Sequence, residues 1–253
     1  MLSKNRIKQL QSLQLKKNRD LGKLFIAEGK KTVSELLDHH AELITEIFIT
    51  PALLNTQAAR LSQKHIHFTE VSEDEFARIS LQATPAGIMA VCRYFDEVQP
   101  EFNFEKDFAF YLDEIRDPGN FGTIIRLADW FGSRTVFCSP NCCELYNPKV
   151  IQATMGAFLR VNVVYVELGE LIEKQKIETV YGALLEGKNL YRETLKPGLI
   201  VIGNEANGIS KQNLPRITHP VTIPASGSNG TESLNAAMAT SIIASEFFRQ
   251  LKL

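Results

Sequence analysis

Two runs, one beginning at residue 108 and the other at residue 199, contain only apolar residues and glycine, and they constrain the fold more than any other feature. The runs are FAFYL at 108–112 and LIVIG at 199–203. A strand with one solvated face alternates apolar and polar side chains, so a continuous apolar run predicts a strand that is buried on both faces. Such strands are typical of parallel sheets that helices cover on both sides. We therefore expect an α/β fold with a parallel sheet.

The residues around these runs, from 107 to the C-terminus, alternate between strand-like and helical patterns. Within 120–131, for example, Ile124, Ile125 and Ala128 have the spacing of one buried helix face. The alternation predicts successive strand–helix units, as a parallel sheet requires. The predicted strands are 108–115, 134–139, 161–167, 179–186, 198–205 and 220–224, and the predicted helices are 120–131, 148–159, 170–176 and an Ala-rich terminal helix that opens at Glu232, Ser233, Leu234 and Asn235.

The first 95 residues form a shorter alternation that predicts a small α/β unit. The predicted strands are 23–29, 46–50, 65–71 and 87–95, and the predicted helices are 30–39 and one that begins after Ser72. Ser72 and Glu75 have the spacing of a capping box. Residues 96–106 are acidic, contain Pro100 and show no sustained period, which is typical of a linker. We therefore expect two domains, 1–98 and 107–253.

Positive charge is concentrated at the N-terminus, although the formal net charge of the chain is only −1. Residues 1–31 carry nine Lys and Arg residues against Asp20 and Glu28. Such a basic arm attracts phosphate groups, and the alternative interpretation is an ordinary solvated helix face. The basic residues are Lys4, Arg6, Lys8, Lys16, Lys17, Arg19, Lys23, Lys30 and Lys31.

The four cysteines, Cys92, Cys138, Cys142 and Cys143, match neither a disulfide framework nor a usual zinc spacing. We expect them to be reduced thiols in a cytoplasmic protein without a metal site. The sequence has no apolar stretch long enough for a membrane span, and its start has no apolar signal-peptide core, so we expect neither.

Three glycine-bearing loops follow predicted strands, at the edge where parallel sheets bind ligands. They read DEIRDPGNFGTIIR at 113–126, LIVIGNEANGIS at 199–210, and IPASGSNGTESLN at 223–235. Taken singly, each has a structural explanation: a turn in the first, a solvated Glu205 in the second, and a helix N-cap by Ser233 or Thr231 in the third. Three such loops on one sheet predict a ligand site more specifically than any one of them.

The three loops carry recognisable motifs: N-x-G-x-x-x-R at 120–126, G-N-E-x-x-G at 203–208, and I-P followed by S-L-N within 223–235. In spacing and order, residues 107–253 resemble the SpoU-type (TrmH-like) RNA 2′-O-ribose methyltransferases of the SPOUT superfamily. Residues 1–95 are more loosely similar to the substrate-binding domain of that family. The resemblance implies a parallel-sheet domain with a trefoil knot, S-adenosylmethionine as cofactor, a structured RNA as substrate, and a homodimer with its active site near the interface.

The resemblance also implies which residues act, and two departures from the family pattern accompany it. The loop between Pro224 and Ser233 is longer than in the family, and alanine replaces larger or more polar residues at three positions. These positions are Ala225, Ala236 and Ala237. The implied catalytic cluster is Asn120, Arg126, Glu205, Ser233 and Asn235, and the implied adenine pocket is Gly203, Ile223 and Leu234.

Methyl transfer to a ribose requires an activated 2′-hydroxyl, and the family assigns that role to Arg126. Because arginine is a poor proton acceptor, we expect Arg126 to stabilise a developing alkoxide, with direct deprotonation as the alternative. The two-domain layout favours ribosomal RNA over transfer RNA. A non-catalytic RNA-binding protein is a less favoured alternative, since it would need none of the cluster. A dehydrogenase is disfavoured because the G-x-G-x-x-G fingerprint is absent from the sequence.

Overall fold

The chain divides into two compact units, which a computed structural model describes over residues 1–96, 102–227 and 233–253. The first unit contains Met1–Glu97 and Leu145–Leu159, and the second contains Val98–Glu144 and Arg160–Leu253. The expected boundary at residue 98 lies outside the described residues. The expected limits of 1–98 and 107–253 stay a prediction. The compact units differ from them chiefly at 145–159, which belongs to the first unit.

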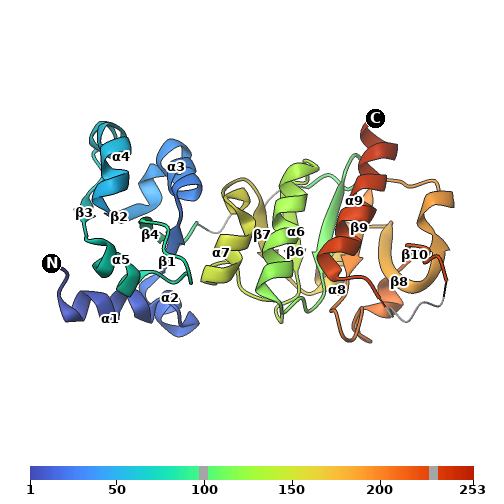
Figure 1. Ribbon diagram of the computed structural model, residues 1–253. Coiled ribbons are helices and arrows are strands. Elements are labelled where there is room, and N and C mark those ends of the chain that lie inside the picture. Colours follow the sequence, from blue (N-terminus) through green and yellow to red (C-terminus); the bar gives the residue numbers. More distant parts are fainter. Residues whose placement is uncertain (97–101, 228–232) are drawn as a thin grey trace. The chain divides into compact units, whose positions relative to one another are not determined.

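A four-stranded sheet forms the centre of the first unit (Figure 1). Its order is β1-β4-β2-β3, in which β4 runs antiparallel to both neighbours and β2 runs parallel to β3. Helix α5 begins with the predicted capping box of Ser72 and Glu75. The elements are α1 (Lys4–Ser12), α2 (Lys16–Gly22), β1 (Leu24–Glu28), α3 (Lys30–His39), the 3₁₀ turn η1 (Ala41–Leu43), β2 (Ile44–Ile49), α4 (Pro51–Gln63), β3 (Phe68–Glu70), α5 (Glu73–Ile79) and β4 (Ile88–Arg93).

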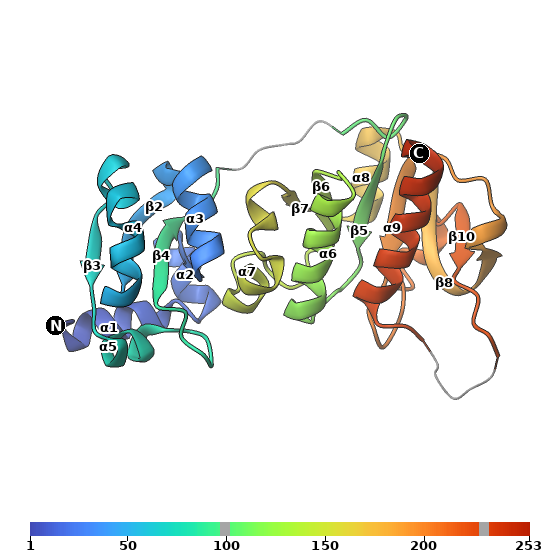
Figure 2. The ribbon, with the colours of Figure 1, turned by 45° about the horizontal axis from the view of Figure 1, so that its top comes forward.

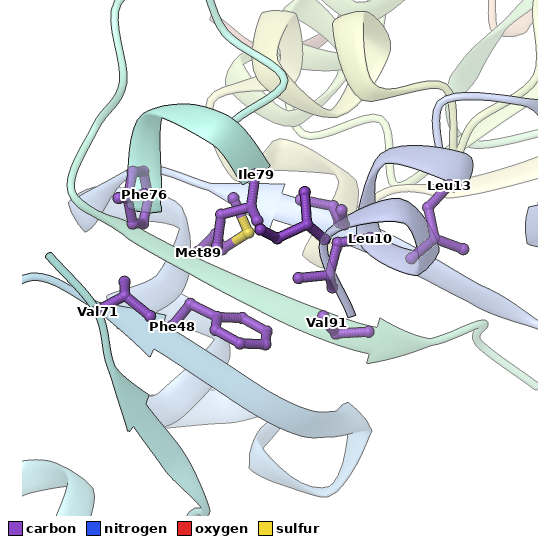
Figure 3. Close-up of a cluster of buried hydrophobic side chains, with 10 residues drawn as sticks. Leu10, Leu13, Phe48, Val71, Phe76, Ile79, Met89 and Val91 are labelled. Carbon is purple, nitrogen blue, oxygen red and sulfur yellow. The ribbon is translucent and has the colours of Figure 1, made fainter. Parts of the chain in front are cut away.

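The basic N-terminal arm is folded into the core of this unit. Leu10 and Leu13 are buried and pack with Phe48, Phe76 and Met89 from the sheet and from α5 (Figure 3). Burial of a leucine side chain stabilises a fold by about 2 kcal/mol, so these contacts anchor α1 firmly. The arm is therefore part of the folded unit.

Arg19 differs from the other basic residues of the arm because it is only 2% exposed. Its Nη1 donates to the carbonyl oxygens of Leu13 and Gln14, each at 2.7 Å. These carbonyls follow α1, where helix geometry leaves backbone acceptors without intrahelical donors. The interpretation of Arg19 as a phosphate-attracting residue was therefore wrong, and its charge serves the link between α1 and α2.

Residues 145–159 join the first unit through aromatic contacts. The ring of Tyr146 stacks on that of Tyr94, with centroids 3.7 Å apart, and the Tyr146 hydroxyl accepts a hydrogen bond from the Phe95 amide at 2.8 Å. The rings of Phe158 and of Phe25 in β1 are nearly perpendicular, with centroids 5.9 Å apart. Aromatic pairs of this kind each add about 1 kcal/mol beyond burial. Sequence position alone does not reveal this association.

The helix predicted at 148–159 is shorter than expected. Helix α7 ends at Thr154 because Met155 and Gly156 have φ angles of 49° and 95°, outside the right-handed helical region. Helix α7 spans Pro148–Thr154, and the 3₁₀ turn η2 spans Ala157–Leu159.

A six-stranded sheet, parallel throughout, forms the second unit (Figure 1). Its order is β10-β8-β9-β5-β6-β7, so β5 and β9, the two continuous apolar runs, lie at the centre. The predicted parallel α/β sheet is confirmed. The elements are β5 (Phe108–Leu112), α6 (Pro118–Trp130), β6 (Thr135–Cys138), β7 (Asn162–Tyr165), α8 (Leu168–Gln175), β8 (Val180–Asn189), η3 (Leu190–Arg192), β9 (Gly198–Ile202), η4 (Leu214–Arg216), β10 (His219–Thr222) and α9 (Ala236–Lys252).

The packing of strand β5 on both of its faces explains its continuous apolar run. Phe108 packs against Phe247 of α9, with ring centroids 5.5 Å apart, whereas Tyr111 packs with Leu168 and Leu171 of α8. Helices α6 and α9 lie side by side on one face of the sheet, and α8 covers the opposite face (Figures 1 and 2). Both faces of β5 are therefore buried under helices.

The parallel arrangement places the loops after β5, β9 and β10 at one edge of the sheet. These are the three glycine-bearing loops, and the third is described only up to residue 227 and again from residue 233. The predicted extra length of that loop, Thr231 and Glu232 lie outside the described residues. The trefoil knot stays a prediction. In the described ranges, no helix combines the length and apolar character that a bilayer span needs.

Candidate functional site

The loop after β5 leads directly into α6 through a helix cap. Asp117 is the N-cap residue, and its Oδ1 accepts a hydrogen bond from the Asn120 amide at 2.7 Å. Pro118 occupies the first helical position, where its missing N–H costs no hydrogen bond. This cap fixes Asn120 in the first turn of α6, at the carboxyl edge of the sheet.

The loop after β9 forms a tight hairpin that carries Glu205. Asn204 and Gly208 exchange two backbone hydrogen bonds, of 2.9 and 2.8 Å. A Cβ atom on Gly203 would lie 2.2 Å from the carbonyl carbon of Gly208, so only glycine permits this approach. Gly208 itself has a φ of 66°, which glycine adopts without strain. The turn leaves Glu205 exposed at its tip.

The third loop ends in α9, whose N-cap is Asn235. The Oδ1 atom of Asn235 accepts hydrogen bonds from the amides of Ala237 and Met238, at 3.0 and 3.3 Å. The helix predicted to open at Glu232 thus begins later, at Ala236, and the prediction that Ser233 caps it was wrong. Asn235 forms the cap because its side chain, and not that of Ser233, immediately precedes the first helical residue.

The side chains of Glu205, Asn120 and Asn235 form one continuous chain of hydrogen bonds. Asn120 Nδ2 donates to Glu205 Oε1 at 2.5 Å, and Asn235 Nδ2 donates to Asn120 Oδ1 at 2.9 Å. The three residues are widely separated in sequence and come from α6, the β9 hairpin and the start of α9. The structure therefore gathers three of the five predicted catalytic residues at one point.

The other two predicted catalytic residues, Arg126 and Ser233, are close in sequence to Asn120 and Asn235, and both are exposed. Arg126 is on the solvent-facing side of α6, with Trp130 one turn further along the same face. Ser233 lies just before the Asn235 cap. Both are accessible to a ligand from solvent.

The predicted adenine-pocket residues flank the same sheet edge. Gly203 follows β9, and Ile223 follows β10 as a half-buried side chain. Leu234 is 47% exposed beside the Asn235 cap. Exposed aliphatic side chains next to backbone groups of a glycine loop suit a flat aromatic ring with polar edges, such as adenine. The residues present therefore fit the adenosyl group of S-adenosylmethionine.

Sequence reasoning assigned no role to a group of residues that hold the hairpin. Asp113 is 1% exposed, and its Oδ2 accepts a hydrogen bond from the Ser210 amide at 2.8 Å. Asn204 Nδ2 donates to the carbonyl oxygen of Glu114 at 2.9 Å. One available signal was the position of Asp113 directly after a fully buried strand, since a buried carboxylate needs hydrogen-bond donors.

The thiols near this edge belong to the end of β6 and its following turn. Burial raises the pKa of Cys138 well above its usual value, and a hydrogen bond from Cys138 lowers the pKa of Cys142. The Cys142 thiol donates to the Leu112 carbonyl oxygen at 3.1 Å. Across the described part of the chain, His, Cys, Asp and Glu side chains form no cluster of three or more suited to a metal ion.

Comparisons with known proteins match both parts of the chain. Residues 107–245 match the model of the SpoU rRNA Methylase family, and residues 4–90 match an MRM3-like substrate binding domain. The 23S rRNA (guanosine(2553)-2'-O)-methyltransferase RlmP of Bacillus subtilis (strain 168) is 28% identical over 242 residues, covering 94% of this chain and 94% of that protein.

Solved structures that are similar over nearly the whole chain include the following two. A TrmH-family protein from Porphyromonas gingivalis has 39% sequence identity and a TM-score of 0.84, with 99% of each chain covered. An AdoMet-bound rRNA methyltransferase from Sinorhizobium meliloti has 26% identity and a TM-score of 0.84, covering 99% of this chain and 97% of its own.

The double role of Asn235 gives a testable prediction. Asn235→Ala removes the α9 cap and the donor to Asn120, so we expect the free energy of unfolding to fall by about 1–2 kcal/mol. Asn235→Asp keeps the capping oxygen and should restore most of that stability. Ser233→Ala is the matched control and should change stability by less than about 0.5 kcal/mol. Equilibrium urea unfolding measures all three, and an unaltered Asn235→Ala variant contradicts the assigned cap.

Proposed function

The chain belongs to the SpoU rRNA methylase family, and from this premise we propose that it transfers a methyl group from S-adenosylmethionine to a ribose 2′-hydroxyl of ribosomal RNA. The observation that carries the proposal is the hydrogen-bond chain of Glu205, Asn120 and Asn235, which joins all three motif loops. A binding protein has no need of such a junction. Incubation with methyl-labelled S-adenosylmethionine and either ribosomal or transfer RNA tests the proposal, and label in transfer RNA alone contradicts the choice of substrate.

The cofactor would be held by the residues around the carboxyl edge of the sheet. Ile223 and Leu234 would contact the adenosyl group, and the backbone at Gly203 would meet its polar edge. When bound, S-adenosylmethionine supplies an electrophilic methyl group on a positively charged sulfur, a good leaving group. The protein must therefore orient the ribose and promote loss of the proton from its 2′-hydroxyl.

Arg126 is the residue we assign to the hydroxyl. The hydroxyl oxygen gains negative charge as its proton passes to solvent water, which reaches this exposed residue, and the positively charged guanidinium stabilises that charge. It can also hold an adjacent RNA phosphate through paired N–H donors. Glu205 holds the Asn120 amide by a charge-assisted hydrogen bond, and Asn120 and Asn235 would orient the ribose or Arg126. Ser233 would add a further donor and acceptor at the ribose.

Removal of the Arg126 side chain should separate chemistry from cofactor binding. In Arg126→Ala we expect kcat to fall by at least about 100-fold, because one charge-stabilising group is removed. The Kd for S-adenosylmethionine, measured by calorimetry, should change by less than about twofold. Arg134→Ala, an exposed arginine between α6 and β6, is the matched control and should keep its activity. Normal turnover by Arg126→Ala removes this residue from the mechanism.

We assign RNA recognition to the first unit, whose residues 4–90 match a substrate binding domain. Three of the exposed lysines of the arm, Lys4, Lys8 and Lys17, are suited to phosphate contacts, whereas Lys16 is paired with Asp20. Structured RNA is read largely through its backbone and shape, which matches such a surface. The full-length match to a ribosomal RNA methyltransferase favours ribosomal over transfer RNA.

Charge reversal tests this surface better than truncation, because removal of α1 would also remove Leu10 from the core. The triple variant Lys4→Glu, Lys8→Glu and Lys17→Glu should bind RNA more weakly. The slope of log K against log salt should become shallower by about 0.7–0.9 for each RNA phosphate that the arm no longer neutralises. Cofactor affinity should not change. An equal charge reversal at Lys106, Lys176 and Lys196 is the control, and an equal decrease in RNA affinity in both triple variants contradicts a role specific to the arm.

We further propose that the protein is a cytoplasmic homodimer that uses α6 and α9 as its interface. The supporting observation is the set of large apolar side chains that these helices expose: Trp130 is 82% exposed and Met238 is 59% exposed. Large apolar side chains that a fold leaves this exposed are candidates for an association surface. Because Arg126 lies on the same face of α6 as Trp130, such an interface would border the active site.

Light scattering tests the dimer. The wild-type chain should elute at twice its 28.4 kDa mass, and Trp130→Asp should shift the protein toward a single chain because a carboxylate is costly to bury in an apolar interface. Leu21→Asp, at an 83% exposed leucine in the first unit, is the matched control. A wild-type protein that elutes as a monomer overturns the proposal.

A further inference from the structure

The hairpin that carries Glu205 is tied to the neighbouring loop by the side chain of Asn204. Asn204 is half-buried, and its Nδ2 donates to the carbonyl oxygen of Glu114 at 2.9 Å. Its Oδ1 accepts hydrogen bonds from the amides of Ala206 and Asn207, at 2.9 and 3.2 Å. The side-chain oxygen thus accepts within the hairpin, and the side-chain nitrogen donates to the loop after β5.

The partner of Asn204 is held in an unusual conformation. Glu114 has a φ of 57°, in the left-handed region that glycine favours. Its amide donates to Ser139 Oγ at 2.9 Å, and its carboxylate accepts from Arg116 at 2.7 Å. Strained residues of this kind persist only where surrounding contacts fix them. The carbonyl that Asn204 meets is therefore oriented by contacts from the end of β6 as well as from its own loop.

A second tie secures the other end of the hairpin. The buried Asp113 carboxylate accepts from the Ser210 amide at 2.8 Å, and the Asp113 amide donates to the Ile202 carbonyl oxygen at 2.8 Å. Asn204 and Ser210 therefore bracket the hairpin, with Glu205 between them. In this arrangement the Asn204 bond lies immediately beside the residue that contacts Asn120.

We propose that Asn204 is a positioning residue for methyl transfer, which holds the β9 hairpin so that Glu205 meets the Asn120 amide. The inference rests on the proposed function, because it assigns Glu205 and Asn120 to the reaction site. To replace Asn204, a side chain of the same length needs both an acceptor and a donor. The acceptor receives the amides of Ala206 and Asn207, and the donor reaches the carbonyl oxygen of Glu114. An alanine provides neither, and an aspartate provides the acceptor alone.

Two substitutions and one control test the role. Asn204→Ala and Asn204→Asp should each lower kcat by about 10–100-fold, the range expected when a reacting group is displaced by roughly 1 Å. The KM for RNA and the Kd for S-adenosylmethionine should stay within about twofold. Asn207→Ala is the control. Asn207 reaches Asn204 Oδ1 through its backbone amide, which alanine retains, so this variant should keep the wild-type kcat. If Asn204→Asp keeps full activity, the acceptor bonds within the hairpin are enough to position Glu205 without the bond to Glu114, and the proposal is overturned.

A double-mutant cycle separates positioning from general stability. If Asn204 acts through Glu205, Asn204→Ala should reduce kcat by less than about twofold in a Glu205→Ala background, because coupled residues are non-additive. A similar reduction of kcat in both backgrounds, or wild-type kcat in Glu205→Ala, overturns the proposal. Calorimetric binding of S-adenosylmethionine by each variant confirms that the folded site is retained.

Nitrogen-15 spectra of asparagine-labelled protein give a readout that does not depend on activity. Asn204→Ala should shift the Asn120 side-chain amide signals in the same direction as Glu205→Ala does, whereas Asn207→Ala should leave them unchanged. Unmoved Asn120 signals in Asn204→Ala overturn the positioning role. If the wild-type chain methylates no RNA, the proposed function fails, and these spectra alone decide whether Asn204 positions Glu205.

Discussion

The rest of the site depends on the two hydrogen bonds of the Asn120 side-chain amide. Its nitrogen donates to Glu205 and its oxygen accepts from Asn235, so one planar group connects the β9 hairpin with the start of α9. A carboxylate or an aliphatic side chain at this position cannot make both bonds. The carboxylate at one end of the chain of hydrogen bonds strengthens it, because hydrogen bonds to ionised groups are stronger than those between neutral groups.

The parallel sheet makes this junction possible, since it brings the ends of β5, β9 and β10 to the same edge. Two helices, α6 and α9, begin there, and their caps are Asp117 and Asn235. Helix N-termini carry partial positive charge, which favours anionic groups nearby. The site is therefore built from stabilising elements: Asn235 caps α9 with its oxygen and serves the site with its nitrogen. Under the proposed function, stability and chemistry share residues here, so we expect substitutions at the edge to affect both.

The basic residues of the first unit have two different roles. Arg19 is buried and satisfies backbone carbonyls after α1, whereas Lys4 and Lys8 stay exposed on α1. The first kind of residue holds the arm in place, and the second kind gives it an exposed positive charge, to which we assign RNA contacts under the proposed function. The stacking of Tyr146 on Tyr94 adds a segment from far along the chain to the same unit. A domain limit drawn through the linker alone therefore misses part of this unit.

The sequence by itself determined the fold class and indicated the candidate residues of the site. Continuous apolar runs such as 108–112 predict strands buried on both faces, and each glycine motif followed the strand expected of it. Short-range patterns also predicted the Ser72 capping box, because a cap depends on neighbours a few residues away. The resemblance to the family, carried by the three loop motifs, named Asn120, Glu205 and Asn235, and the structure brought these three together.

Tertiary structure alone decided the contacts between segments that are distant in the chain. The choice of Asn235 over Ser233 as the cap, the end of α7 at Thr154, and the burial of Arg19 depend on backbone geometry and packing that no local pattern specifies. The tie from Asn204 to Glu114 belongs to the same class, since its two ends lie on different loops. A motif fixes which chemical groups are available, whereas only the folded sheet fixes which of them meet, because hydrogen bonds form over about 3 Å regardless of separation in sequence.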